Sequence, residues 1–202
     1  HTRQSLIEGV SEWKYLHAVQ GRDSHYELHS HNVGGSLKRQ DFDIRLEGDG
    51  ANFHLKSASF LSESKHIDQQ ITLNHLGKNT KSTQVINNVA DSKATATCNG
   101  RIVIDNGSSK ADASLSNKNL ALGDNVTFNA KPELEIYNDD VSCSHGATIS
   151  QLSESELFYL TSRGVHPARA KNMMARGFLN EAISGALQEI STHRLESFFP
   201  KI

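Results

Sequence analysis

Residues 131–149 read KPELEIYNDDVSCSHGATI, and this stretch decides the fold because its side chains alternate as they do in a β-strand. Leu134 and Ile136 alternate with charged residues. In an extended strand every second side chain lies on the same face. The face that begins at Val141 therefore continues with Cys143, His145, Ala147 and Ile149. At Leu152 the pattern changes to that of a helix.

One thiol and one imidazole fall on this shared face. Cys143 and His145 would lie about 7 Å apart, because a strand rises about 3.3 Å per residue. Two such donors on one face could hold a transition metal or a metal cluster. Alternatively, Cys143 is a small buried hydrophobic residue and His145 is its hydrogen-bonded polar neighbour. The spacing alone favours this structural alternative, since Cys-x-His is not a closed metal-site pattern.

The composition is that of a near-neutral globular chain. Its 202 residues suffice for one large domain or for one domain with an appendage. A net charge of −2 gives no electrostatic argument for binding to nucleic acid or to a membrane surface. No apolar run approaches the roughly 20 residues that cross a bilayer, and the first residues lack a signal peptide. Two cysteines make no disulfide framework, so we expect a cytoplasmic protein, and a first residue that is not Met suggests a fragment.

Short strand-like segments separated by polar turns follow one another from about residue 35 to residue 149. Phe42, Ile44 and Leu46 alternate with charged residues, and the next segment begins after the turn 48–50. We expect Gly48 and Gly50 to adopt positive φ angles in that turn. The pattern fits an antiparallel sandwich or barrel as well as a parallel β-helix, and its irregular turns, rich in Asn and Ser, suit the corners of a solenoid.

A helical segment follows the strands. Residues 152–157, LSESEL, form a capping box in which Ser153 caps the amide of Glu156. The helix is expected to run to about Arg163 and to stop at Gly164, and Pro167 is expected to begin a second helix. That second helix carries an apolar stripe of Ala170, Met174, Phe178 and Ala182, which Leu179 and Ile183 widen. The stripe could pack against the strands or bind a partner.

A histidine-rich strand is expected near the start of the chain. In HYELHSH, at 25–31, the side chains of His25, Glu27, His29 and His31 would share one face. Histidines on one strand face could bind a metal. The structural alternative is a solvated polar face opposite the buried Tyr26 and Leu28.

Four segments carry a resemblance to a known family: KPELEIYNDDVSCSHGAT at 131–148, GDGANFHL at 48–55, KADASLSNKNLAL at 110–122 and QLSESELFYLTSRGV at 151–165. Together they resemble the SufB/SufD family, the scaffold proteins of the SUF iron–sulfur cluster assembly system. The resemblance covers about residues 35–184. SufB-like chains have Glu where Gly146 stands and a Cys within the segment that matches 117–124, so the resemblance is to the SufD side of the family.

The resemblance implies an all-β core, a right-handed parallel β-helix over residues 1–150, with the N-terminal part of the full chain missing. It implies a C-terminal α-helical segment over 151–202. If each coil takes roughly 20 or more residues, the β-region holds on the order of five rungs.

The resemblance also implies a function. The chain would be a non-catalytic scaffold subunit that pairs with a SufB-like protein and docks the SufC ATPase, with a homodimer of the isolated chain as a further arrangement. A transient iron–sulfur cluster would be shared with the partner subunit, and flavin binding stays open. His145 is the implied cluster ligand or sulfur-path residue, and Cys143 is a weaker candidate. The implied SufC-side residues are Phe158, Tyr159, Arg163 and Gly164. The implied SufB-interface residues are Glu135, Tyr137, Asp139 and Asp140.

Two enzyme classes are the alternatives. A β-helical carbohydrate-active enzyme needs paired carboxylates on one face. Asp139 and Asp140 are the adjacent acidic pair near the candidate site, but neighbours on a strand point to opposite faces. A metal-binding hydrolase could use His25, His29 and His31 with a carboxylate, but the helical H-E-x-x-H spacing is absent from the sequence.

Overall fold

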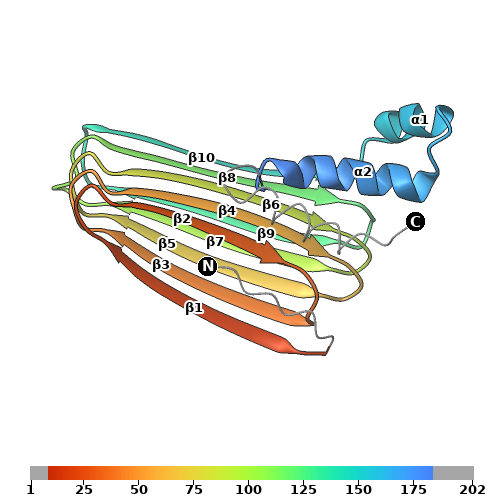
Figure 1. Cartoon of the computed structure of the whole chain (residues 1–202), viewed down its shortest axis with the longest axis horizontal. Helices are drawn as coiled ribbons and strands as arrows, with labels where there is room; N and C mark the ends of the chain where they lie inside the picture. Colours follow the sequence, from red (N-terminus) through yellow and green to blue (C-terminus); the bar gives the residue numbers. More distant parts are fainter. Residues whose placement is uncertain (1–8, 184–202) are drawn as a thin grey trace.

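Ten strands and two helices follow one another in the computed structural model, which describes residues 9–183 (Figure 1). One parallel sheet contains, in spatial order, β1 (Ser11–Gln20), β3 (Leu37–Leu46), β5 (His66–His75), β7 (Thr95–Ile104) and β9 (Thr127–Ile136). The other contains β10 (Val141–Gln151), β8 (Ala111–Ala121), β6 (Lys81–Ala90), β4 (Asn52–Leu61) and β2 (His25–Asn32). Consecutive strands alternate between the sheets, so each pair is one turn of a solenoid. The predicted parallel β-helix of about five turns is confirmed.

Each turn of the solenoid stacks in register on the turn before it. Leu37 pairs with His66 and His66 pairs with Thr95, so one turn takes 29 residues in this region. This register places Ile44, Leu73, Ile102 and Leu134 in one column that points between the sheets. The first three are fully buried, and each removes its side chain from water at a gain of about 1.5–3 kcal/mol. Such columns form the core that the period-two alternation predicted.

The interior also contains polar side chains, which stack in columns of their own. Gln69 lies among the apolar residues of β5 and is fully buried. Its Nε2 donates to Oε1 of Gln40 at 3.0 Å and to Oγ of Ser57 at 2.8 Å. These bonds join neighbouring turns and opposite sheets, because Gln40 and Ser57 belong to β3 and β4. A buried amide is tolerated in this core because its donor is satisfied.

The glycines of the 48–50 turn serve two different needs. Gly50 has a φ of 72°, as predicted. The prediction for Gly48 is wrong, because its φ is not positive. A Cβ at Gly48 would lie 2.0 Å from the backbone nitrogen of Arg22, in the corner of the preceding turn. Gly48 is therefore required by the close stacking of two corners.

The predicted helices are present as α1 (Glu154–Ser162) and α2 (Pro167–Asn180). Oγ of Ser153 accepts from the amide of Glu156 at 3.3 Å, so the predicted N-cap is confirmed. At the other end the amide of Val165 donates to the carbonyl of Leu160, and that of Gly164 donates to Thr161. With Gly164 at a φ of 85°, these bonds make a Schellman motif that ends α1. Pro167 is the first residue of α2, as predicted.

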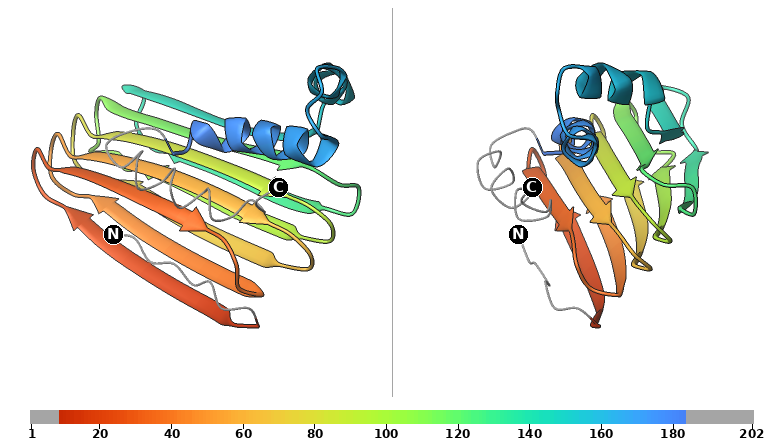
Figure 2. Two further views of the ribbon diagram at one scale, coloured as in Figure 1. Left: turned by 45° about the vertical axis from the view of Figure 1, so that its right-hand side comes forward. Right: turned by 90° about the vertical axis from the view of Figure 1, so that its right-hand side faces the viewer.

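The stripe on α2 packs against the outside of the β2–β10 sheet. Leu179, Ala182 and Ile183 of the stripe are buried in one cluster with Val89 of β6 and Leu120 of β8. Ala175, which was not part of the predicted stripe, is buried with them. Nδ2 of Asn87 donates to the carbonyl of Phe178 at 2.7 Å. Figure 2 shows α2 lying along this sheet and α1 running across the end of α2. The stripe is therefore used for packing within the chain, and residues 184–202 of the predicted helical segment lie outside the described residues.

The steric role of Gly48 gives a stability prediction. Gly48→Ala should lower the free energy of unfolding by about 1–3 kcal/mol, because the added methyl group overlaps the backbone of the preceding corner. Gly21→Ala is the matched control, since a Cβ at Gly21 meets nothing within 4 Å in the same corner. Urea denaturation followed by circular dichroism measures both. Equal midpoints for the two variants would contradict the close-stacking account.

Candidate functional site

Within residues 9–183, the inward face of the last turn of the solenoid, made by β9 and β10, is not covered by another turn. Both strands are outermost in their sheets. Residues on neighbouring parallel strands in register point the same way. His145 pairs with Leu115, which is 3% exposed, and yet His145 itself is exposed. The inward face of β10 is thus oriented like a core face, but within residues 9–183 no further turn stacks on it.

Cys143 and His145 lie on this face together, as the alternation predicted. Cys143 pairs with Ala113 and packs against the cluster of Ile102, Ile104 and their neighbours. Burial raises the pKa of the Cys143 thiol, and the nearby Asp112 raises it further. The packed, half-buried state of Cys143 agrees with the structural alternative. That alternative is wrong for His145, whose imidazole ring forms no hydrogen bond within the described part of the chain.

Apolar side chains surround the two donors on the open end. Ile136 is 43% exposed on β9 and Ile149 is 60% exposed on β10. Beyond residues 9–183 nothing is described, and within them no strand pairs with the outer edges of β9 and β10. Unpaired edges with apolar neighbours are the usual template for strand addition by another chain. The site therefore combines an imidazole, a thiol and a surface suited to association.

The four residues assigned to the SufB side lie at or beside the β9–β10 turn. Glu135 points outward and accepts from Nη2 of Arg101 at 2.7 Å, which lowers the pKa of its carboxyl group. Tyr137 is 62% exposed. Asp139 and Asp140 lie in the turn, so the argument from strand alternation does not apply to them. Their positions place all four near the uncovered end.

A closed metal centre is not present in the described residues. Within residues 9–183 no group of three or more His, Cys, Asp or Glu side chains could hold a metal ion. No helix there is long and apolar enough to cross a bilayer.

Helix α1 carries exposed side chains and no buried residue. Phe158 is 72% exposed and Tyr159 is 55% exposed. Arg163 lies over the ring of Tyr159, with its guanidinium carbon 3.7 Å from the ring centroid. This contact confirms that Tyr159 and Arg163 share one face of the helix. A cation–π contact at an exposed site contributes about 0.5–1 kcal/mol and fixes the orientation of both groups.

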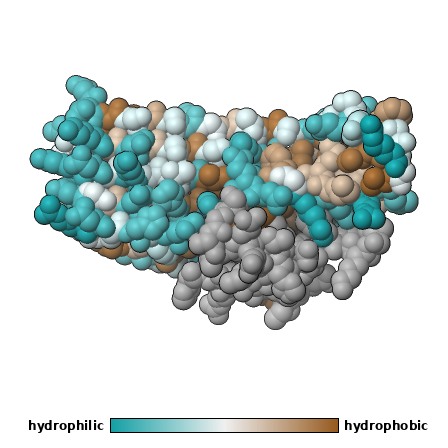
Figure 3. All heavy atoms as spheres, turned by 45° about the horizontal axis from the view of Figure 1, so that its top comes forward, coloured by the Kyte–Doolittle hydropathy of each residue, from teal (hydrophilic) through white to brown (hydrophobic). Residues whose placement is uncertain are grey.

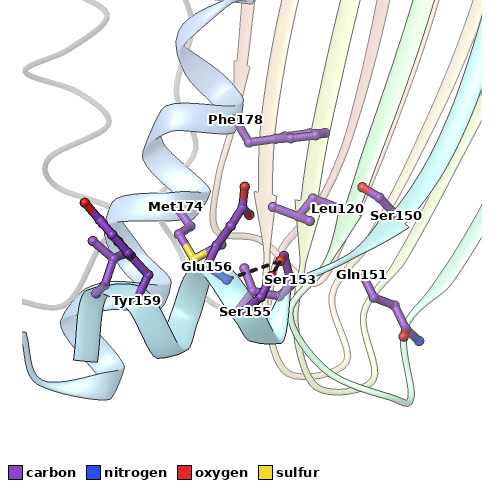
Figure 4. A pocket seen from close by; sticks show the side chains of 11 residues that line it. Leu120, Ser150, Gln151, Ser153, Ser155, Glu156, Tyr159, Met174 and Phe178 are labelled. Atoms are coloured by element: carbon purple, nitrogen blue, oxygen red, sulfur yellow. Dashed lines mark hydrogen bonds between the residues drawn. The ribbon is translucent and has the colours of Figure 1, made fainter. Parts of the chain in front are cut away.

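A groove of about 760 Å³ separates α1 from α2 and the ends of β8 and β10. Figure 4 shows Tyr159 and Met174 at one side of it and Leu120 and Phe178 at the other. Figure 3 shows hydrophobic residues gathered toward the helical end of this face and hydrophilic residues at the opposite end. Leu120 was not assigned to a site from the sequence, because its place in the groove depends on how α1 and α2 fold over β8.

Comparison with known proteins agrees with the fold and the motifs. Residues 2–178 match the family model for the SUF system FeS cluster assembly, SufBD core domain. The chain belongs to the SufBD family. It is SufD-like, because it is 32% identical to the iron–sulfur cluster assembly protein SufD of Escherichia coli. The aligned region is 153 residues long and covers 76% of this chain.

Other SufBD relatives cover a similar part of the chain. A SufBD family iron–sulfur cluster assembly protein of Synechocystis is 32% identical over 167 residues, or 82% of this chain. The chloroplastic protein ABCI7 of Arabidopsis thaliana is 29% identical over 184 residues, or 90% of this chain. The chain spans 36–38% of the length of these three relatives.

The two thiols should differ in reactivity. Cys98 is buried, and burial raises its pKa to about 12, whereas Cys143 is partly exposed at the open end. Iodoacetamide at pH 8 should alkylate Cys143 in the folded protein at least about tenfold faster than Cys98, because alkylation needs an accessible thiolate. Mass spectrometry of timed samples measures both sites.

The Cys143→Ser variant is the control for this comparison. It should resist alkylation until urea unfolds it, after which Cys98 reacts. Rapid labelling of Cys98 in the native Cys143→Ser protein would show that the core is not packed as described.

Proposed function

We propose that this chain is a non-catalytic scaffold subunit of SUF iron–sulfur cluster assembly, and that its uncovered last turn pairs with a SufB-like subunit. The observation that carries the proposal is the inward face of β10, where His145 is exposed although it is in register with a buried residue. A core face of this kind is stable in water only when another surface covers it. Membership of an iron–sulfur assembly family supports the identity of that partner.

His145 supplies the chemistry at the shared surface. A neutral imidazole nitrogen can bind iron, and the Cys143 thiol stands next along the same face. Two donors from one chain do not close a coordination sphere, so the remaining ligands would come from the partner or from sulfide. A scaffold that releases its cargo benefits from such an incomplete ligand set. The transient cluster is cargo in this proposal, and the chain performs no catalytic step.

The SufC ATPase would dock on α1. Phe158, Tyr159 and Arg163 present the aromatic and guanidinium groups that dominate the energetics of many interfaces. Gly164 fixes the turn that follows them. The adjacent groove would receive an apolar side chain of the ATPase. A cytoplasmic location follows from the cysteine usage of the sequence.

The role of His145 is tested in the assembled complex with a SufB-like subunit and SufC. His145→Ala should lower cluster loading about tenfold or more while the complex still assembles, because a ligand is lost from a surface residue. His145→Asn should fail equally, since an amide is a poor ligand for iron. Iron and sulfide assays and the visible absorption of the cluster measure loading.

Ser144→Ala is the matched control, because Ser144 lies on the same strand with its side chain on the opposite face. It should load normally. If the complex with His145→Ala loaded clusters fully, His145 would not be part of the site. If His145→Asn restored cluster loading, His145 would form a structural hydrogen bond and would not be a ligand.

The docking role of α1 is tested by binding to SufC. Tyr159→Ala combined with Arg163→Ala should weaken the Kd about 30-fold, because truncating hot-spot residues costs about 2 kcal/mol or more. The melting temperature should hardly change, since neither side chain is buried. The control combines Tyr15→Ala with Arg45→Ala, a Tyr and an Arg on the other sheet. Equal affinities for both double variants would place the SufC site elsewhere.

A further inference from the structure

A second group of titratable side chains lies at the opposite end of the described solenoid, on the outer face of β2 and β4. In the parallel register Glu27 pairs with His54, and His29 pairs with Lys56. The outward side chains of the two strands are therefore His25, Glu27, His29, His31, His54 and Lys56. The cluster site at β10 uses none of them.

Two of these histidines face each other across the two turns. The ring centroids of His25 and His54 are 5.3 Å apart, and the rings are tilted by 47°. Two imidazoles that bind one ion at about 2.1 Å with a tetrahedral angle have centroids about 5 Å apart. The observed centroid distance is therefore compatible with the two rings binding one ion between β2 and β4.

The ring nitrogens of this pair are available. No hydrogen bond or ion pair joins His25 or His54 to another residue within 9–183.

The charges around the pair are mixed. Glu27, opposite His54, brings a carboxylate that favours a cation, and the same carboxylate raises the pKa of His54. Lys56 lies 3.6 Å from Oε1 of Glu27 and partly offsets it. Because the Glu27 carboxylate already contacts both His29 and Lys56, it does not act as a third ligand in this arrangement.

The other histidines of the strand are placed differently. His29 is 2% exposed, and its Nε2 lies 2.9 Å from Oε1 of Glu27. His31 is also buried. The expectation of a solvated face is therefore wrong for these two residues, and neither is open to an ion from solvent. Among the four histidines of β2 and β4 whose burial differs in this way, His25 is exposed and His54 is half-buried.

We propose that His25 and His54 form a binding site for one divalent transition-metal ion that links the first two turns of the described solenoid. Two protein nitrogens, with water in the remaining positions, suit an ion that prefers imidazole, such as Zn²⁺, Ni²⁺ or Cu²⁺. The ion acts as a clamp between β2 and β4. This site is independent of the function proposed for β10.

Zn²⁺ titration of the whole chain by calorimetry tests the site. The wild type should bind one equivalent that His25→Ala and His54→Ala each abolish. The double variant should lose no more than either single variant, because both nitrogens hold the same ion. Zn²⁺ should also raise the melting temperature of the wild type and of neither single variant, since the ion binds the folded state.

Two further variants separate metal binding from packing. His54→Phe keeps an aromatic ring beside His25 but lacks a nitrogen, so it should fold normally and lose the zinc equivalent. His66→Ala removes a histidine from the other sheet and should bind zinc as the wild type does. The proposal would be overturned if His54→Phe still bound one equivalent of Zn²⁺. It would also be overturned if the losses of Zn²⁺ binding in the two single variants were independent and additive.

Discussion

In-register stacking of parallel turns is the constraint on which the rest of the structure depends. Every turn satisfies its backbone hydrogen bonds and covers its inward side chains only through the turns on either side of it. Columns such as Ile44, Leu73 and Ile102 follow directly from this repetition. The same repetition stacks the corner of each turn on the corner of the preceding turn. Gly48 therefore has no room for a side chain. Stability is therefore shared between neighbours, and the last turn lacks one.

The uncovered turn and the chemical groups of the candidate site occur at the same place for one physical reason. A side chain on an inner turn is enclosed by its neighbours, as Leu115 and Cys98 are. The equivalent position on β10 carries His145, which keeps its ring nitrogens free for a ligand. An association surface and a ligand-bearing surface thus coincide, and pairing with a partner would bury the apolar rim while enclosing the donors.

The helices divide their surfaces between folding and recognition. Leu179, Ala182 and Ile183 of the apolar stripe are buried against the β2–β10 sheet, whereas Met174 and Phe178 are half-buried and line the groove. Helix α1 buries nothing and is held by its N-cap and by the Schellman motif at Gly164. Its aromatic face consequently remains available, next to a groove that α2 helps to form. A short helix that is fixed at both ends and exposed along its length is suited to docking.

The sequence by itself determined the local structure. The alternation of Phe42, Ile44 and Leu46 predicts a strand, and Ser153 and Gly164 mark the ends of α1. Both predictions succeed because side-chain direction and helix capping depend on residues that are near neighbours in the sequence. The shared face of Cys143 and His145 was predicted for the same reason. Only the tertiary structure decided that Gly48 is needed for close approach, that His29 is buried, and that His54 stands beside His25. The Gly48–Arg22 and His25–His54 contacts join residues that are 26 and 29 positions apart in the sequence. The register of the solenoid brings them together, and this register is set by the packing of whole turns.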